Sequence, residues 1–125
     1  MTVATAERTT EQNIQYWGAQ QDALGFESVW SIWECSDVNQ SLLKKGKSYR
    51  VFYRFYSNDT TTSEIMSDTA TMIEVSALTD GGTVLDLWKA AEQCWQKAKA
   101  KGDWHKYVEN FEMQDDGSFE LVMGS

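Results

Sequence analysis

The amino-acid sequence predicts an α+β fold, a two-layer sandwich in which an antiparallel sheet of about five strands carries two helices on one face. Three observations predict it. Residues 83–101 show an apolar stripe with helical period, residues 49–56 alternate as a strand does, and an Asp-Gly turn separates two apolar runs near the C-terminus. The expected order is helix, three strands, helix and two strands. Strands adjacent in sequence are expected to pair as meanders.

We expect residues 1–125 to form a single domain, because a chain of 125 residues lies in the usual size range and can bury a core of its own. Residues 1–8 are expected to form a disordered arm. Their sequence has neither a basic start nor an apolar segment, so it does not predict a secretory signal. No apolar run approaches the roughly 20 residues that span a bilayer, so no membrane association is expected.

The first helix is predicted to begin at Thr9 or Thr10, either of which can cap it, and to end at Gly25. Gln12 lies three residues after Thr9, which is the spacing of a capping box. The apolar line of this helix is narrow and consists of Ile14, Trp17, Gln21 and Leu24.

Three strands are predicted to follow. Residues 28–35 are rich in β-forming side chains and contain no glycine, and residues 49–56 alternate along their length. The third strand is predicted over residues 70–78. A loop rich in Thr, Ser, Asn and Asp is expected over residues 57–67.

The second helix, over residues 83–101, is the strongest prediction. Thr83 can cap it with Asp86 in a capping-box position, and Gly102 can adopt the left-handed conformation that ends it. Glu92 lies off the apolar stripe with the other polar residues. The stripe consists of Val84, Leu87, Trp88, Ala91, Cys94, Trp95 and Ala98.

A hairpin is predicted from residues 107–113 and 118–123, because their connection at 114–117 contains the Asp-Gly pair that favours a tight turn. The side chains expected to share one side of this hairpin are Tyr107, Phe111, Met113, Phe119, Leu121 and Met123.

The composition argues against cofactor chemistry. His105 is the only histidine, Cys35 and Cys94 are the only cysteines, and the chain has no glycine-rich phosphate loop and no metal-ligand spacing. No cofactor or metal is expected. The distant cysteines are expected to be free thiols in a reducing compartment, which predicts a cytoplasmic protein, and a disulfide between them is the alternative.

The formal net charge is −8, with the acids concentrated over residues 55–88 and 102–125. Repulsion from phosphate argues against direct binding of nucleic acid. A protein partner with a basic surface is the natural complement, since opposite charges speed encounter. The equal alternative is that the charge only keeps the protein in solution.

Few residues could carry catalysis. Cys94 and His105 are the one cysteine–histidine pair, but Cys94 lies on the apolar stripe and is expected to be an inert thiol. Asp115 and Asp116 are expected to lie in a solvated turn. Glu109 would become a site candidate only if burial raised its pKa. We therefore expect the protein not to be an enzyme.

Arginines alternate with aromatic residues along one face of the strand over 49–56. Arg50, Arg54 and the rings between them could stack on a ligand or bind a carboxylate or phosphate. We favour the alternative, in which the arginines pair with acids of neighbouring strands such as Glu34 or Glu74. The core of so small a domain cannot hold all the aromatic side chains. Some of the following rings are therefore expected at the surface: Trp30, Trp33, Phe52, Tyr56 and Trp104. Exposed aromatic rings commonly form binding hot spots.

Residues 85–122 contain Leu87-Trp88 at the start of a helix, the break Gly102-Asp103-Trp104, and Asp116-Gly117 before Phe119 in a hairpin. In these features the chain resembles the C-terminal half of the YezG-like immunity proteins, and the strand over 51–56 is similar to the aromatic second strand of that family. The loop over 57–69 departs from the family pattern. The resemblance implies a protein that neutralises a cognate toxin by binding it, without catalytic residues.

These observations together predict a non-enzymatic acidic protein-binding module, an immunity protein or small inhibitor from a phage or toxin locus that neutralises a basic partner such as a nuclease. One alternative is a small-molecule-binding or enzymatic cone of the nuclear-transport-factor-like kind, with a deep pocket lined by Tyr49, Tyr53, Glu109 and Trp104. The other is a structural domain that forms homodimers. The expected partner-binding residues are Asp103, Trp104, Glu109, Glu112, Asp115, Asp116, Glu120, Arg50, Phe52, Arg54 and Tyr56.

Overall fold

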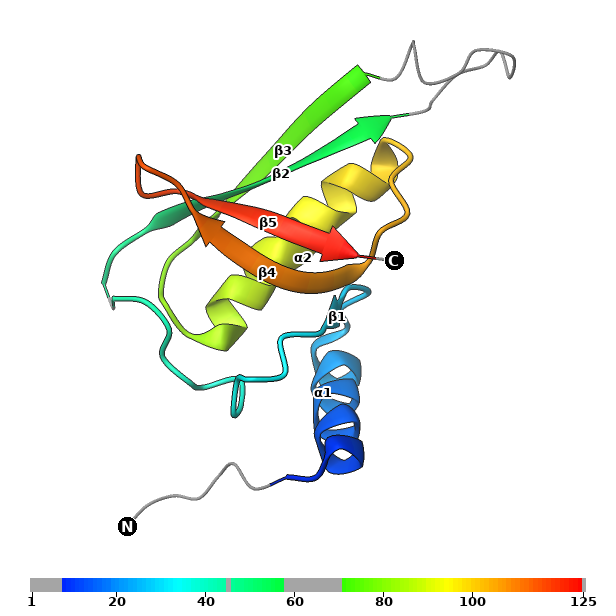
Figure 1. Ribbon diagram of the computed structural model, residues 1–125, viewed down its shortest axis with the longest axis vertical. Coiled ribbons are helices and arrows are strands. Elements are labelled where there is room, and N and C mark those ends of the chain that lie inside the picture. The colour runs from blue at the N-terminus through cyan, green and yellow to red at the C-terminus, as the bar shows by residue number, and fades with distance from the viewer. Residues whose placement is uncertain (1–7, 45, 58–70, 125) are drawn as a thin grey trace.

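The computed structural model describes residues 8–44, 46–57 and 71–124. The predicted α+β order of helix, three strands, helix and two strands is confirmed (Figure 1). The expected arm over 1–7 and the expected loop over 58–67 lie outside the described residues. The elements are α1 (Thr10–Leu24), β1 (Val29–Trp30), β2 (Tyr49–Ser57), β3 (Thr71–Thr79), α2 (Val84–Ala100), β4 (Tyr107–Met113) and β5 (Phe119–Gly124).

The five strands form one mixed sheet in the order β1-β4-β5-β2-β3. The β2–β3 and β4–β5 pairs are antiparallel, whereas β1 pairs with β4 and β2 pairs with β5 in parallel. Two pairs of strands adjacent in sequence therefore form as predicted, whereas the prediction of a purely antiparallel sheet is wrong. The physical reason is that α2 carries the chain from the edge strand β3 back across the sheet, so the β4–β5 hairpin enters between β1 and β2 (Figure 1).

Both helices begin and end as their sequences predict. Thr9 Oγ1 accepts a hydrogen bond from the backbone N–H of Gln12, and Thr83 Oγ1 accepts one from Asp86, each as part of a complete capping box. Gly25 ends α1 in the left-handed conformation at φ 74°. Local capping chemistry alone thus sets these boundaries to within a residue.

The strand predicted over residues 28–35 is reduced to β1. After Trp30 the chain turns, because the indole N–H of Trp30 donates to the carbonyl of Ile32 at 3.1 Å and the backbone N–H of Cys35 donates to the same oxygen at 3.3 Å. Arg8, which was expected in the disordered arm, is also held in place. Its guanidinium donates to Asn13 and to the carbonyl of Ser36 and lies over the ring of a tyrosine in α1.

The core lies between the sheet and the two helices, which meet on one face of it as predicted. Trp17 of α1 and Trp88 of α2 both pack on Trp30 of β1, with ring centroids 5.9 and 5.7 Å from the Trp30 ring. The inward side chains of β2, such as Val51 and Phe55, continue this cluster beneath α2. One hydrophobic cluster therefore joins all the layers.

Glu92 was expected to be exposed but is buried, with 9% of its surface accessible. Its carboxylate accepts hydrogen bonds from the backbone N–H groups of Glu27 and Ser28 and from the Ser28 hydroxyl. The indole N–H of Trp88 donates to the same hydroxyl at 3.1 Å. Because the turn before β1 needs acceptors for its buried N–H groups, this carboxylate joins that turn to α2.

The β4–β5 hairpin forms as predicted, but an irregularity in β4 between Val108 and Asn110 shifts its side chains. As a result Val108 is fully buried, although it was not in the predicted inward set. Tyr107 was in that set and instead lies opposite Gly124, on the other face. Met113 keeps its predicted place opposite Phe119 but is exposed at the end of the strand. Phe111 packs on the core as expected, with its ring centroid 5.9 Å from that of Trp30.

Candidate functional site

In Figure 1 α2 covers one face of the sheet, and we call the other face the open face. Cross-strand register places most of the predicted partner-binding residues on it. Side chains alternate along a strand, so when Val51 and Phe55 point to α2 their neighbours point away. Cross-strand register then identifies the residues of the open face: Arg50, Phe52, Arg54, Tyr56, Met72, Glu74, Ser76, Leu78, Asn110, Glu112, Glu120 and Val122.

The arginines of β2 are engaged on this face. The Arg50 and Arg54 guanidiniums lie 4.8 and 4.9 Å from the centroid of the Phe52 ring, which is buried beneath them. Both arginines also pair with Glu74 of β3, as the favoured alternative predicted, whereas no ion pair joins either to Glu34. Phe52 is therefore a covered residue and is not among the predicted set of rings that lie at the surface.

The acids of β4 and β5 lack this compensation. Glu112 and Glu120 stand directly opposite each other across the two strands. Over residues 8–44, 46–57 and 71–124, no basic side chain pairs with either of them or with Glu109. Like charges at directly opposed positions destabilise a sheet, so a cation from outside would be favourable here. Glu109 is exposed, and the burial that would have made it a catalytic candidate is not found.

A hollow opens where β2 and β5 separate. The two strands pair only at Val51–Phe119 and Phe52–Glu120, and beyond these pairs they diverge (Figure 1). The hollow between them has a volume of about 470 Å³, and we call it the notch. Its lining residues are Tyr53, Arg54, Phe55, Tyr56, Trp104, His105, Glu120, Leu121, Val122 and Met123.

Asp103 lies buried beside the notch. One carboxylate oxygen accepts a hydrogen bond from the Tyr53 hydroxyl at 2.8 Å, and the other lies 2.8 Å from Nδ1 of His105. Burial, aided by this hydrogen bond and the charge of Asp103, raises the pKa of Tyr53, so its hydroxyl stays a donor. Asp103 was expected on the partner-binding surface, and the structure instead makes it an internal acceptor that orients His105. Trp104 stacks on His105 with centroids 4.0 Å apart and is 64% exposed.

A carboxylate-oriented imidazole can act as a general base, but the one predicted cysteine partner is out of reach of it. Cys94 is fully buried beneath β2, its thiol lies 3.7 Å from the carbonyl oxygen of Val51, and burial raises its pKa to about 12. The aromatic residues named for the pocket of an enzymatic cone line different hollows. Tyr53 and Trp104 line the notch, whereas Tyr49 lies at a separate hollow near the hairpin turn.

We expect both cysteines to resist alkylation in the folded protein. Burial raises the pKa of Cys35 to about 11 and that of Cys94 to about 12, so near neutral pH each thiol stays protonated and covered. Both are free, as predicted. Mass spectrometry after iodoacetamide treatment should show no adduct in buffer and two adducts in denaturant. Labelling of Cys94 in buffer at the unfolded rate would contradict its position in the core.

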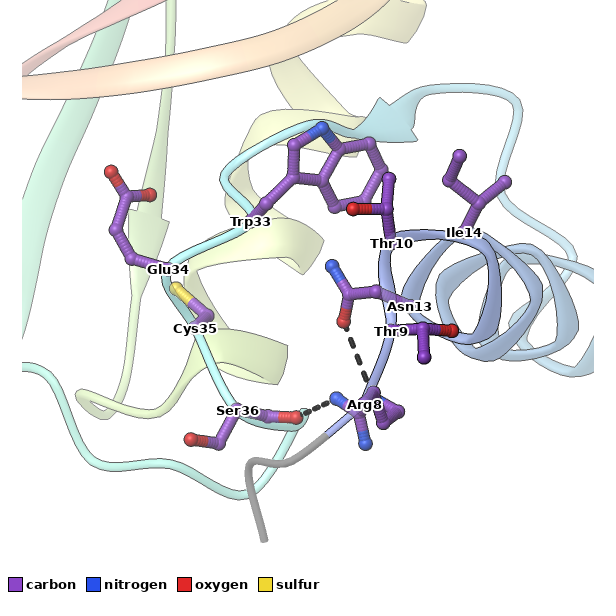
Figure 2. Close-up of a pocket in the computed structure, with 9 residues that line it drawn as sticks. All are labelled: Arg8, Thr9, Thr10, Asn13, Ile14, Trp33, Glu34, Cys35 and Ser36. Carbon is purple, nitrogen blue, oxygen red and sulfur yellow. Dashed lines mark hydrogen bonds between the residues drawn. The ribbon is translucent and has the colours of Figure 1, made fainter.

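A second hollow, about 290 Å³, lies between the start of α1 and residues 33–36 (Figure 2). In Figure 2 the Arg8 side chain reaches across its lower end to Asn13 and Ser36, and the Trp33 indole lies beside Thr10. No predicted site residue lines it. No local pattern could have revealed it, because its two walls meet only when the chain after β1 turns back past α1.

The acids at the hairpin turn lie away from the notch, at the opposite end of β5. Asp116 accepts hydrogen bonds from the backbone N–H and the hydroxyl of Ser118, and these lower its pKa. Asp115 is exposed, as expected of a solvated turn. Of the rings expected at the surface, Trp33, Tyr56 and Trp104 are exposed.

Within the described residues, no group of three His, Cys, Asp or Glu side chains is placed to hold a metal ion. No helix in the same residues has the length and apolar character needed to cross a membrane. Comparisons of the chain with protein-family models, with curated proteins and with solved structures found no match. The resemblance to the YezG-like immunity proteins therefore stays a prediction.

Proposed function

We propose that this chain is a non-enzymatic acidic protein-binding module of the cytoplasm that acts as an immunity protein or small inhibitor and neutralises a partner with a basic surface, such as a nuclease. The observation that carries the proposal is the uncompensated pair of Glu112 and Glu120 on the open face. A domain without a partner gains nothing from two opposed carboxylates. A basic partner would supply the missing cation.

The exposed rings support the same conclusion. Tyr56 and Trp104 lie at the notch, next to Glu120, and are 63% and 64% exposed. Large rings beside charged groups are typical of interface hot spots, because they contribute apolar area while the charges steer the encounter. The two arginines of the open face share the single carboxylate of Glu74, so the β2–β3 side of this face keeps one positive charge in excess, and the acids lie on its β4–β5 side.

The double variant Glu112→Gln/Glu120→Gln tests this proposal. We expect association with the basic partner to slow by about tenfold at low ionic strength, with a smaller effect at high salt. Stability should rise slightly, by up to about 0.5 kcal/mol, because the like-charge repulsion is removed. The measurements are stopped-flow or biosensor kinetics with the protein that the wild-type chain retains at low salt, together with urea titration.

The control is Glu11→Gln/Asp22→Asn, which removes the same charge from exposed positions of α1. If only net charge matters, both double variants will slow association equally, and the open face will have no special role. Unchanged kinetics in both variants, or a chain that retains no basic protein and only associates with itself, would rule out the proposal in favour of an oligomerising domain.

A further inference from the structure

We propose that the notch receives an extended segment of the partner as an added β-strand, with apolar side chains pointing to its floor and Lys or Arg side chains pointing to the open face. This inference rests on the proposed function and names the part of the basic partner that the site recognises. It uses the backbone of two strands as well as their side chains, which is the mode of recognition known as strand addition.

The backbone carries the first part of the inference. Beyond Phe52, β2 continues for five residues with β3 as its only neighbour, and beyond Glu120, β5 continues to Gly124 with β4 as its only neighbour. Within the described chain, these two facing edges therefore have no strand between them. Backbone N–H and C=O groups along such edges are a template for another strand, which could here pair on both of its sides.

The floor and rim of the notch determine the side chains that fit. Towards the α2 side, an inserted segment would meet Tyr53, Phe55 and Leu121, which belong to the core cluster, and the stacked Trp104–His105 pair. Apolar side chains suit that floor. Because successive side chains of a strand point to opposite faces, the alternate positions would reach the open face.

The charge of the rim selects the residues at those alternate positions. Glu120 lines the notch and has no basic partner among the described residues, and the Glu112 carboxylate stands opposite it on the next strand. Arg54, on the other rim, shares Glu74 with Arg50, so that rim stays positively charged. A Lys or Arg of the inserted segment would therefore lie towards the β5 side of the notch, where it is attracted to Glu120 and Glu112. Its sequence should alternate apolar and basic residues.

The outer edge of β3 is a less suitable site for an added strand. There the Lys97 side chain of α2 donates to the backbone carbonyl of Ser76 in β3. A lysine held at an edge strand discourages pairing with another chain. The notch has no such lysine among its lining residues, and it also has two edges where β3 has one.

The probe is a capped heptapeptide that alternates Val and Lys, added to the isotope-labelled full chain and followed by NMR. We expect the largest shifts at the backbone amides of residues 53–57 and 121–124 and at the Trp104 indole. N-methylation of every second peptide nitrogen should weaken binding by at least about tenfold, because it removes one row of backbone hydrogen bonds. Replacing Lys with Glu in the peptide should weaken binding at least as much.

Two exposed side chains of the chain itself provide a matched pair. Trp104→Ala should weaken binding of the Val–Lys peptide by about tenfold, since the exposed ring lines the notch. Leu78→Ala, on the same face but at the outer strand β3, should leave the affinity unchanged. Both residues are more than half exposed, so neither change should unfold the protein.

Strand addition is wrong if the N-methylated peptide binds as tightly as its parent, if the shifts fall on β3 instead, or if millimolar peptide moves no amide of the notch. In any of these cases the proposed function still holds provided that the intact basic partner associates more slowly with the Glu112→Gln/Glu120→Gln variant. Conversely, if the peptide binds in the notch but the chain retains no basic protein, strand addition is supported and the proposed function is contradicted.

Discussion

Trp88→Ala should lower the free energy of unfolding by about 3–5 kcal/mol. Trp88 is fully buried in α2 and packs against Trp17, Phe26 and Trp30, with ring centroids 5.3 to 5.9 Å away. Its indole also donates to the Ser28 hydroxyl. Truncation therefore leaves a cavity at the one place where α1, β1 and α2 meet.

Urea titration followed by circular dichroism measures this loss. Trp104→Ala is the matched control, because it removes the same side chain from an exposed position, and it should cost less than about 1 kcal/mol. Equal losses in the two variants would mean that the cluster of Trp17, Trp30 and Trp88 does not form the centre of the core.

Glu92→Ala should cost about 3 kcal/mol, a large effect for a charged residue on a helix. The carboxylate accepts from the backbone N–H groups of Glu27 and Ser28, from the Ser28 hydroxyl at 2.6 Å and from the Gln96 amide at 2.8 Å. Alanine would leave several of these donors without a partner inside the protein, and each such donor carries a desolvation penalty.

Gln93→Ala is the control for Glu92, since it is the next residue of α2 and is exposed. Alanine has the higher helix propensity, so this variant should be neutral or slightly stabilising in the same titration. If the free energy of unfolding of Glu92→Ala equalled that of the wild type, the N–H groups of the turn before β1 would have other acceptors. The buried carboxylate would then not be needed to stabilise that turn.

The local elements follow from short-range chemistry, which explains why they could be predicted. Thr9 with Gln12 and Thr83 with Asp86 satisfy N–H groups within three residues, and Gly25 ends its helix by its own conformational freedom. The alternation along β2 likewise gives the correct strand. β1, by contrast, ends early although residues 28–35 are rich in β-forming side chains. The indole N–H of Trp30 donates a hydrogen bond to the Ile32 carbonyl, and the chain turns there.

The candidate site was partly predictable for the same reason. Alternation placed Arg54 and Tyr56 on one face, and both line the notch with Trp104 and Glu120. Nothing in the sequence indicated that Asp103 would turn inward to Tyr53 and His105, because that contact depends on where the chain runs after α2.

The sequence by itself determined the helices, the faces of β2, the hairpin and the excess of acid, because each depends on residues within a few positions of one another. Only the tertiary structure decided that β5 lies beside β2 and that the two strands part beyond Phe52 and Glu120. These features join segments more than sixty residues apart. Such pairings depend on the packing of the whole core, in which Trp88 and Glu92 of α2 contact the residues in and just before β1.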